Sequence, residues 1–190
     1  MRNSQRIIER ISESLDKTAE IQKLPSLTAE DFAEYIMPPC RRWEIAAQII
    51  AEKGMNVAGT FVKELLVWLQ DSNWPGYDTI FHVLTQVQLD QLVDGLRACL
   101  PLAGETKDEM WLEAMYHLMC TAGVTIDDLG DGSSYRAILA MRDHSMDDEK
   151  DGEQCDDAAA NKGNCHPIWE MNREGRENLY KKYREILKNE

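Results

Sequence analysis

The stretch that decides the fold is residues 61–100, FVKELLVWLQDSNWPGYDTIFHVLTQVQLDQLVDGLRACL. Apolar residues recur in it at steps of three and four, which places them on one face of a helix. Because short connections favour antiparallel packing of neighbouring helices, the stretch predicts helical hairpins folded about the Asn-Trp-Pro-Gly corner at residues 73–76. The three apolar stripes are Phe61, Val62, Leu65, Leu66, Trp68 and Leu69; Ile80, Phe81, Val83 and Leu84; and Leu89, Leu92, Val93, Leu96 and Leu100.

The corner contains residues that favour turns and helix starts. Asn73 is suited to cap a helix through its side chain, and Pro75 suits the first turn of the new helix, where its missing N–H has no partner to lose. Trp68 and Trp74 are expected to anchor the corner, because a large aromatic side chain buries much apolar area and its indole N–H needs an acceptor. Pro101 is expected to end the third helix.

Ten residues of the corner form a longer motif, WLQDSNWPGY at 68–77. It resembles the signature of a bacterial domain-of-unknown-function family, the one numbered 5071, in which a Trp-Leu-Gln-Asp-x-Asn-Trp-Pro core precedes helical hairpins. A second feature of that family, an acidic residue three positions before a tryptophan, is matched by Asp108 and Trp111. The resemblance covers about Asn56 to Leu118 and implies a small HEAT-like helical array, but no activity. The structural motif residues are Trp68, Asn73, Trp74, Pro75 and Trp111.

The predicted fold is all-α, with antiparallel helical hairpins stacked as a HEAT-like array of about 8–9 helices. At 190 residues the chain is long enough for a sizeable core, so folding needs neither a metal nor a disulfide. We expect a single helical domain over 1–190. Its predicted parts are an N-terminal helical extension at 1–55, a core helical array at 56–123, an acidic mobile insert at 142–166 and a closing helix at 167–190.

Before the corner, three helices are expected. The first covers residues 4–17, with an apolar stripe of Ile7, Ile8, Ile11 and Leu15. Thr28, with Asp31 three residues later, is expected to cap the second. The third covers Cys40–Lys53 and stops at Gly54.

After the corner, Thr106-Lys107-Asp108-Glu109 matches a capping box. It is expected to open a helix that runs to Ala122 and stops at Gly123. Residues 124–134 are rich in aspartate and glycine and predict a loop. A short helix is expected to follow, with Tyr135, Ile138, Leu139 and Met141 on its apolar face.

The chain is strongly acidic. It has 34 Asp and Glu against 21 Lys and Arg, a net charge of −13, of which residues 1–100 carry −4 and residues 101–190 carry −9. Because phosphate binding needs clustered Lys and Arg, neither nucleic acid nor an anionic membrane is expected as a partner. The charge favours a basic protein partner, although solubility alone also accounts for it.

Nothing in the sequence predicts export or membrane insertion. The first residues lead into a charged amphipathic helix, and no apolar run approaches the roughly 18 residues of a membrane span. Five cysteines without a regular spacing indicate reduced thiols, so a cytoplasmic location is expected. Whether Cys155 and Cys165 pair stays open, as does the oligomeric state.

The acidic insert resembles a calcium loop in part. Asp147, Glu149 and Asp151 precede Gly152 at the spacing of an EF-hand, but Ala158 stands where the closing glutamate is needed. Two other groups have metal-binding residue types. One, which matches no zinc-finger spacing, contains His144, Cys155, Cys165 and His166. The other contains Asp127, Asp128 and Asp131. We expect no metal site and no cofactor.

No catalytic motif is present. Neither His82 nor His117 stands in a nucleophile motif, and glycine-rich phosphate loops are absent. The favoured hypothesis is a non-catalytic helical module that binds a basic protein partner. The alternatives are a bacterial immunity or regulatory protein that neutralises a toxin, a divalent-metal-dependent carboxylate enzyme built on Asp127, Asp128 and Asp131, and a structural scaffold.

Overall fold

A computed structural model of the chain describes residues 3–36, 42–130, 132, 134 and 137–138. None of these residues lies in a β-strand and most of them are helical, so the predicted all-α fold class is confirmed. The helices are α1 (Asn3–Glu13), α2 (Lys17–Gln22), α3 (Ala29–Tyr35), α4 (Trp43–Lys53), α5 (Met55–Ala58), η1 (Gly59–Phe61), α6 (Val62–Val67), η2 (Trp68–Gln70), α7 (Tyr77–Leu84), α8 (Leu89–Thr106), α9 (Glu109–Ala122) and α10 (Ile126–Leu129), where η marks a 3-10 helix.

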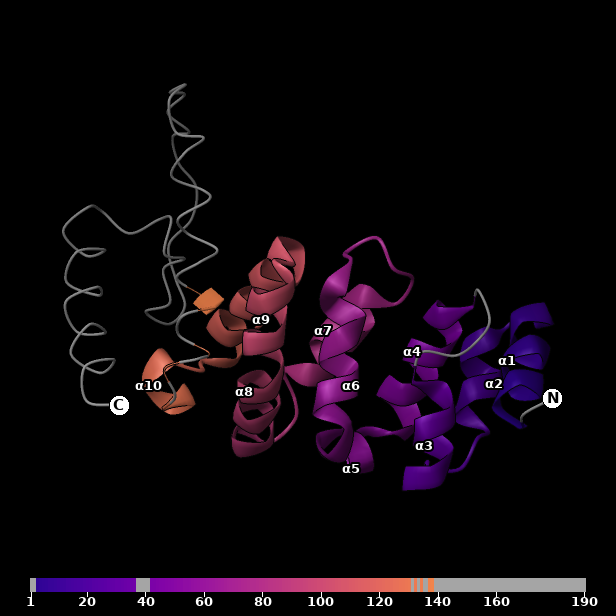
Figure 1. Ribbon diagram of the computed structural model, residues 1–190. Coiled ribbons are helices and arrows are strands. Elements are labelled where there is room, and N and C mark those ends of the chain that lie inside the picture. The colour runs from indigo at the N-terminus through magenta and orange to yellow at the C-terminus, as the bar shows by residue number, and fades with distance from the viewer. Residues whose placement is uncertain (1–2, 37–41, 131, 133, 135–136, 139–190) are drawn as a thin grey trace, which may run out of the picture.

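The helices follow one another along an elongated row, from α1 at one end to α10 at the other (Figure 1). α1, α2 and α3 pack on α4, α4 packs along α7, α6 packs along α8, and α8 contacts both α9 and α10. Helix length varies from four residues in α5 to 18 in α8. The regular stacking of a HEAT-like array stays a prediction.

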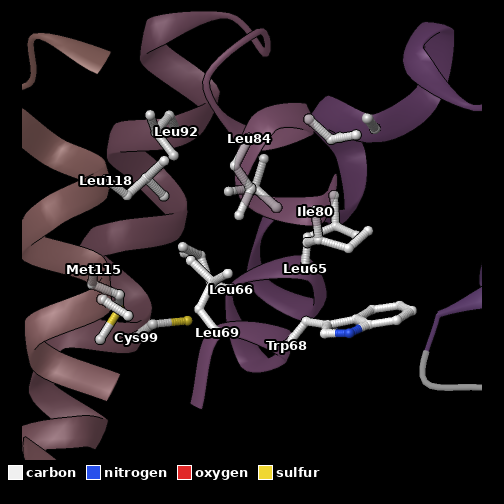
Figure 2. Close-up of a cluster of buried hydrophobic side chains, with 14 of the residues drawn as sticks. Leu65, Leu66, Trp68, Leu69, Ile80, Leu84, Leu92, Cys99, Met115 and Leu118 are labelled. Atoms are coloured by element: carbon white, nitrogen blue, oxygen red, sulfur yellow. The ribbon is translucent and has the colours of Figure 1, made fainter. Parts of the chain in front are cut away.

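The hydrophobic core is continuous from α1 to α10. Around the corner, side chains of α6 and η2 meet those of α7, α8 and α9, as predicted from the three stripes (Figure 2). Leu89, the first residue of α8, is an exception at 49% exposed. The side chains labelled in Figure 2, none more than 5% exposed, are Leu65, Leu66, Trp68, Leu69, Ile80, Leu84, Leu92, Cys99, Met115 and Leu118.

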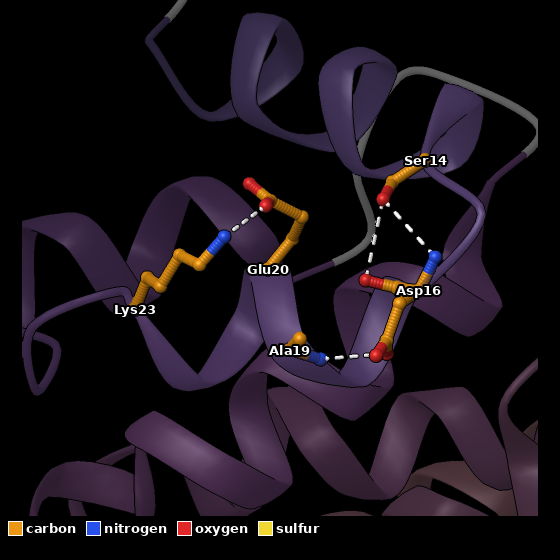
Figure 3. Close-up of polar contacts among 5 residues, drawn as sticks. All are labelled: Ser14, Asp16, Ala19, Glu20 and Lys23. Carbon is orange, nitrogen blue, oxygen red and sulfur yellow. Dashed lines mark hydrogen bonds and ion pairs between the residues drawn. The ribbon is translucent and has the colours of Figure 1, made fainter.

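The predicted first helix ends early, because α1 stops at Glu13, and a second helix that was not predicted, α2, begins at Lys17. The hydroxyl of Ser14 accepts the N–H of Asp16 at 3.2 Å, and Oδ1 of Asp16 accepts the N–H of Ala19 at 2.9 Å (Figure 3). Asp16 therefore caps α2, and Leu15, predicted on the apolar stripe, is fully exposed between the two helices. The prediction of one helix to Lys17 was wrong because serine and aspartate side chains bond the local backbone in preference to continuing a helix.

The predicted cap of the next helix is confirmed in α3. Oγ1 of Thr28 accepts the N–H of Asp31 at 3.2 Å, and Oδ2 of Asp31 accepts the N–H of Thr28 at 3.3 Å, which completes a capping box. Helix α4 ends at Lys53 and is followed by Gly54, also as predicted.

Helix α8 does not end at Pro101. It runs on to Thr106, so this prediction was wrong. Proline removes one helical donor, but Leu100 and Ala103 on either side are both fully buried, and we attribute the continuation of the helix to that packing. Lys107 caps the end of α8: its N–H donates to the carbonyls of Ala103 and Gly104, and its left-handed backbone, with φ of 55°, turns the chain away from the helix.

The start of α9 also differs from the prediction. The hydroxyl of Thr106 donates to the carbonyl of Leu102 at 2.9 Å within α8, so Thr106 does not cap the next helix. The cap is Asp108, whose Oδ1 accepts the N–H of Trp111 at 3.1 Å. The predicted end of this helix is confirmed: α9 stops at Ala122, and Gly123 follows with φ of 75°.

The segment after Gly123 was predicted as a loop, which is wrong for residues 126–129, because they form α10. Thr125 and Asp128 exchange hydrogen bonds in a capping box at its start. At its end the guanidinium of Arg97, from α8, donates to the carbonyls of Leu129 at 2.5 Å and Asp128 at 2.8 Å. The local sequence pattern did not predict this helix, because the hydrogen bonds at its C-terminal end come from Arg97, which lies 31 positions before Asp128.

Several predictions fall outside the described residues. They concern the acidic insert at 142–166, the closing helix at 167–190, the Asp131 carboxylate, and the calcium and zinc groupings of residues 144–166. Within the described part of the chain, no helix is both long enough and apolar enough to cross a membrane.

Candidate functional site

Trp68 closes the predicted corner. Its side chain is fully buried, and its indole Nε1 donates a hydrogen bond to the carbonyl of Pro75 at 3.1 Å. The bond joins the start of η2 to the residue just before Gly76, where the chain turns into α7. Trp68 thus supplies both the apolar area and the hydrogen bond that were expected of an anchor.

Asn73 and Pro75 lie in the corner, but neither starts a helix. Helix α7 begins at Tyr77, after Gly76 with φ of 85°, and has no side-chain cap. Asn73 instead donates its backbone N–H at 2.8 Å and its side-chain amide at 3.0 Å to Oδ1 of Asp71. The cap predicted for Asn73 and the helical first turn predicted for Pro75 were therefore wrong, because Asp71 binds Asn73 in a turn of its own.

The corner packs closely against α4. Trp74, which is half-buried, meets Trp43 edge-on with ring centroids 5.1 Å apart, and Trp43 meets Trp68 in the same way at 5.6 Å. Gly76 comes so close that a Cβ atom there would lie 2.5 Å from Cβ of Ala47. Three tryptophans and one glycine thus join two segments that are about 30 residues apart in sequence.

Trp111 anchors α9 in the same way as Trp68 anchors the corner. It is 2% exposed, and its indole Nε1 donates to the carbonyl of Leu66 at 2.7 Å. Leu66 lies in the last turn of α6, where carbonyl groups lack regular helical partners. The indole satisfies one of these carbonyls and ties α9 to the corner. Trp68 and Trp111 therefore each donate to a backbone carbonyl, which is a structural role.

The surface next to the corner carries a row of three rings, which we call the ring ladder: Tyr77, Phe81 and His117. Tyr77 and Phe81 are half-buried and stack one turn apart on α7, with centroids 6.2 Å apart and planes 26° apart. His117 of α9 is exposed and its ring centroid lies 5.0 Å from that of Phe81.

Two exposed carboxylates flank this ladder, Asp78 from α7 and Glu113 from α9. Burial raises the pKa of Tyr77, and the negative charges of Asp78 and Glu113 raise it further. Asp78 follows Tyr77 directly on α7, and Glu113 lies one turn before His117 on α9. The ion pairs of the described residues are Lys23–Glu20 and Arg97–Asp94, so neither flanking carboxylate is paired with a cation there.

The negative charge of the described region is concentrated in the half of the row that contains the ladder. Residues 71–130, which contain α7 to α10, have ten Asp and Glu against two Lys and Arg, a net charge of −8. Residues 1–70, which contain α1 to η2, have ten Asp and Glu against nine Lys and Arg, a net charge of −1. Eight of the ten carboxylates in residues 71–130 are exposed. The two halves of the row thus differ sharply in surface potential, and the half with α7 to α10 attracts cations.

The comparison with known proteins agrees with the corner and with Trp111. A family model described as "Domain of unknown function (DUF5071)" matches residues 41–159, more than half of the chain. The chain belongs to this family. No curated protein and no solved structure matches it. The family match is longer than the predicted resemblance over 56–118, and it includes α4.

The geometry explains why the family resemblance was visible in those residues. Trp68, Asp71 and Gly76 build the corner, the corner packs on α4, and Asp108 starts the helix that carries Trp111. All of these contacts position backbone segments. The residues of the ring ladder were not singled out as a site from the sequence: the four-residue spacing of Tyr77 and Phe81 was visible, whereas nothing local pairs His117 with them.

The cap at Asp108 supplies a first testable prediction. Replacing Asp108 with alanine is expected to lower the free energy of unfolding by about 1 kcal/mol, because the N–H of Trp111 loses its acceptor. Glu109→Ala, next in sequence and exposed, is the matched control and is expected to cost no more than about 0.5 kcal/mol. Urea unfolding measures both. A larger loss for Glu109 would instead favour a capping box that starts at Thr106.

Asp128, which was weighed as a residue of a metal-dependent enzyme site, has a structural role in the capping box of α10. The carboxylate of Asp128 accepts bonds from Thr125, which lowers its pKa. Burial raises the pKa of the Cys99 thiol to about 11, far from the value of a reactive cysteine. Among the described residues, no three or more His, Cys, Asp or Glu side chains are arranged to hold a metal ion.

Proposed function

We propose that this protein is a helical interaction module that binds a basic protein partner through the face formed by α7 and α9. The observation that carries the proposal is the uneven charge of the row, −8 over residues 71–130 against −1 over residues 1–70. If the negative charge served only solubility, it would not need to be concentrated on one half of the row of helices. An acidic half attracts a basic partner and orients it as the two approach each other.

The ring ladder supports the choice of face. Stable protein interfaces have a core enriched in aromatic side chains and a polar rim. Tyr77 and Phe81 are half-buried, so they offer ring area to a partner without the cost of a large exposed apolar patch. Asp78 and Glu113 supply the charged rim.

The proposal is tested with an octa-lysine peptide as a basic probe. Binding is measured by titration calorimetry at low and at high salt on the whole chain and on the double variant Asp78→Asn, Glu113→Gln. Loss of two exposed ion pairs of about 0.2–1 kcal/mol each is expected to weaken binding roughly two- to thirtyfold. Salt is expected to weaken binding to the whole chain as well.

The matched control is Glu13→Gln with Glu52→Gln, which removes the same charge from exposed positions on α1 and α4. This variant is expected to bind the peptide within about twofold of the unmodified chain, because its carboxylates lie outside the proposed face. Equal losses in the two double variants would show that the probe senses only net charge, and the proposed face would then be rejected.

A further inference from the structure

We infer that the partner group that docks on the ring ladder is an arginine side chain, which lies along the rings of Tyr77 and Phe81 between the carboxylates of Asp78 and Glu113. This inference rests on the proposed function, since it names the chemistry by which the same face would recognise its basic partner. Neither the acidic surface alone nor the rings alone would select arginine.

The geometry of the rings comes first. Tyr77 and Phe81 are separated by one helical turn, and their planes are only 26° apart, so their half-buried edges and faces form one extended aromatic strip along α7. His117 lengthens the strip towards α9. A flat group fits such a strip better than a compact one, because it keeps contact with more than one ring at once.

The carboxylates supply the charge that a cation needs. Asp78 follows Tyr77 on α7, and Glu113 lies one turn before His117 on α9, so negative charge flanks the strip from two helices. Neither carboxylate has an ion-pair partner among the described residues. A cation on the rings would therefore meet two acceptors that no other described group neutralises.

Guanidinium suits this arrangement better than ammonium. It is planar, stacks on aromatic faces, is weakly hydrated and can bond a carboxylate through two parallel N–H groups. The lysine ammonium is a compact, strongly hydrated charge that gains little from a second ring. Lysine and arginine both carry the positive charge that the acidic half attracts, but only arginine also stacks on the rings of the ladder.

The test compares octa-arginine with octa-lysine, two peptides of equal charge, on the whole chain and on Tyr77→Leu. Octa-arginine is expected to bind the whole chain about two- to fivefold tighter through the rings, in addition to any general preference of carboxylates for guanidinium. In Tyr77→Leu that extra preference is expected to disappear while octa-lysine binds as before. Thermal melts check that the variant is folded, and Phe81→Leu serves as a second variant.

The outcomes separate the two proposals. An arginine preference that falls in the leucine variants supports the inference. Equal binding of both peptides, or a preference that survives both leucine substitutions, overturns it and leaves the basic-partner face in place. If neither peptide binds in a manner sensitive to Asp78 and Glu113, both this inference and the proposed function fail.

Discussion

Replacing Trp68 with alanine is expected to lower the free energy of unfolding by about 3–5 kcal/mol, a large part of the stability of a domain this size. The side chain is fully buried between α6, α7 and α4, and its removal leaves a cavity the size of an indole. The carbonyl of Pro75 also loses its donor at 3.1 Å. Urea unfolding followed by circular dichroism measures the change.

Trp74→Ala is the matched control, since it makes the same chemical change six residues along in the same motif. Trp74 is half-buried and rests edge-on against Trp43, so its loss is expected to cost less than half as much. Similar losses for the two variants would mean that Trp68 is not the main anchor of the corner. Trp68→Phe is expected to fall between them, because the ring stays while the hydrogen bond is lost.

Replacing Gly76 with alanine is expected to cost about 2–4 kcal/mol for two separate reasons. At φ of 85° the backbone of Gly76 is left-handed, which an alanine adopts only with strain. The new Cβ would also lie 2.5 Å from Cβ of Ala47, so the corner would have to move away from α4. The same unfolding experiment measures the loss.

Gly123 provides the control for this prediction. It has a similar φ of 75°, but apart from its own local backbone nothing lies within 4 Å of the position a Cβ would take. Gly123→Ala is therefore expected to show only the backbone term, about 1–2 kcal/mol. The difference between the two variants measures the contact between the corner and α4. If the two losses were equal, that contact would contribute nothing, and the close packing of Gly76 against Ala47 of α4 would be rejected as a source of stability.

The apolar spacing was enough to predict most helices, because burial of one face is what stabilises a helix in a folded chain. Leu65, Leu66 and Leu69 faced the core as expected. The cap of α9 was harder to predict, because Thr106 and Asp108 are both residue types that cap helices and lie within three positions of each other. Thr106 had the better pattern, but α8 extended through it and Asp108 became the cap.

The candidate face on α7 and α9 could not be predicted from local sequence patterns, for a similar reason. Tyr77 and Phe81 could be read as neighbours from their four-residue spacing on one helix. His117 and Glu113 lie more than 30 residues further on, and only the packing of α9 against the corner brings them to the same place. The indole bond from Trp111 to Leu66 is part of that packing.

The sequence by itself determined the all-α class, the position of the corner, the family and the acidic charge. Each of these depends on residue spacing or on composition, which are properties of a short segment or of the whole chain. Only the tertiary structure decided that Pro101 lies within a helix, that Arg97 completes α10, and that rings and carboxylates meet on α7 and α9. These outcomes depend on which distant side chains share a surface, because contacts across the core outweigh local preferences that are worth about 1 kcal/mol or less.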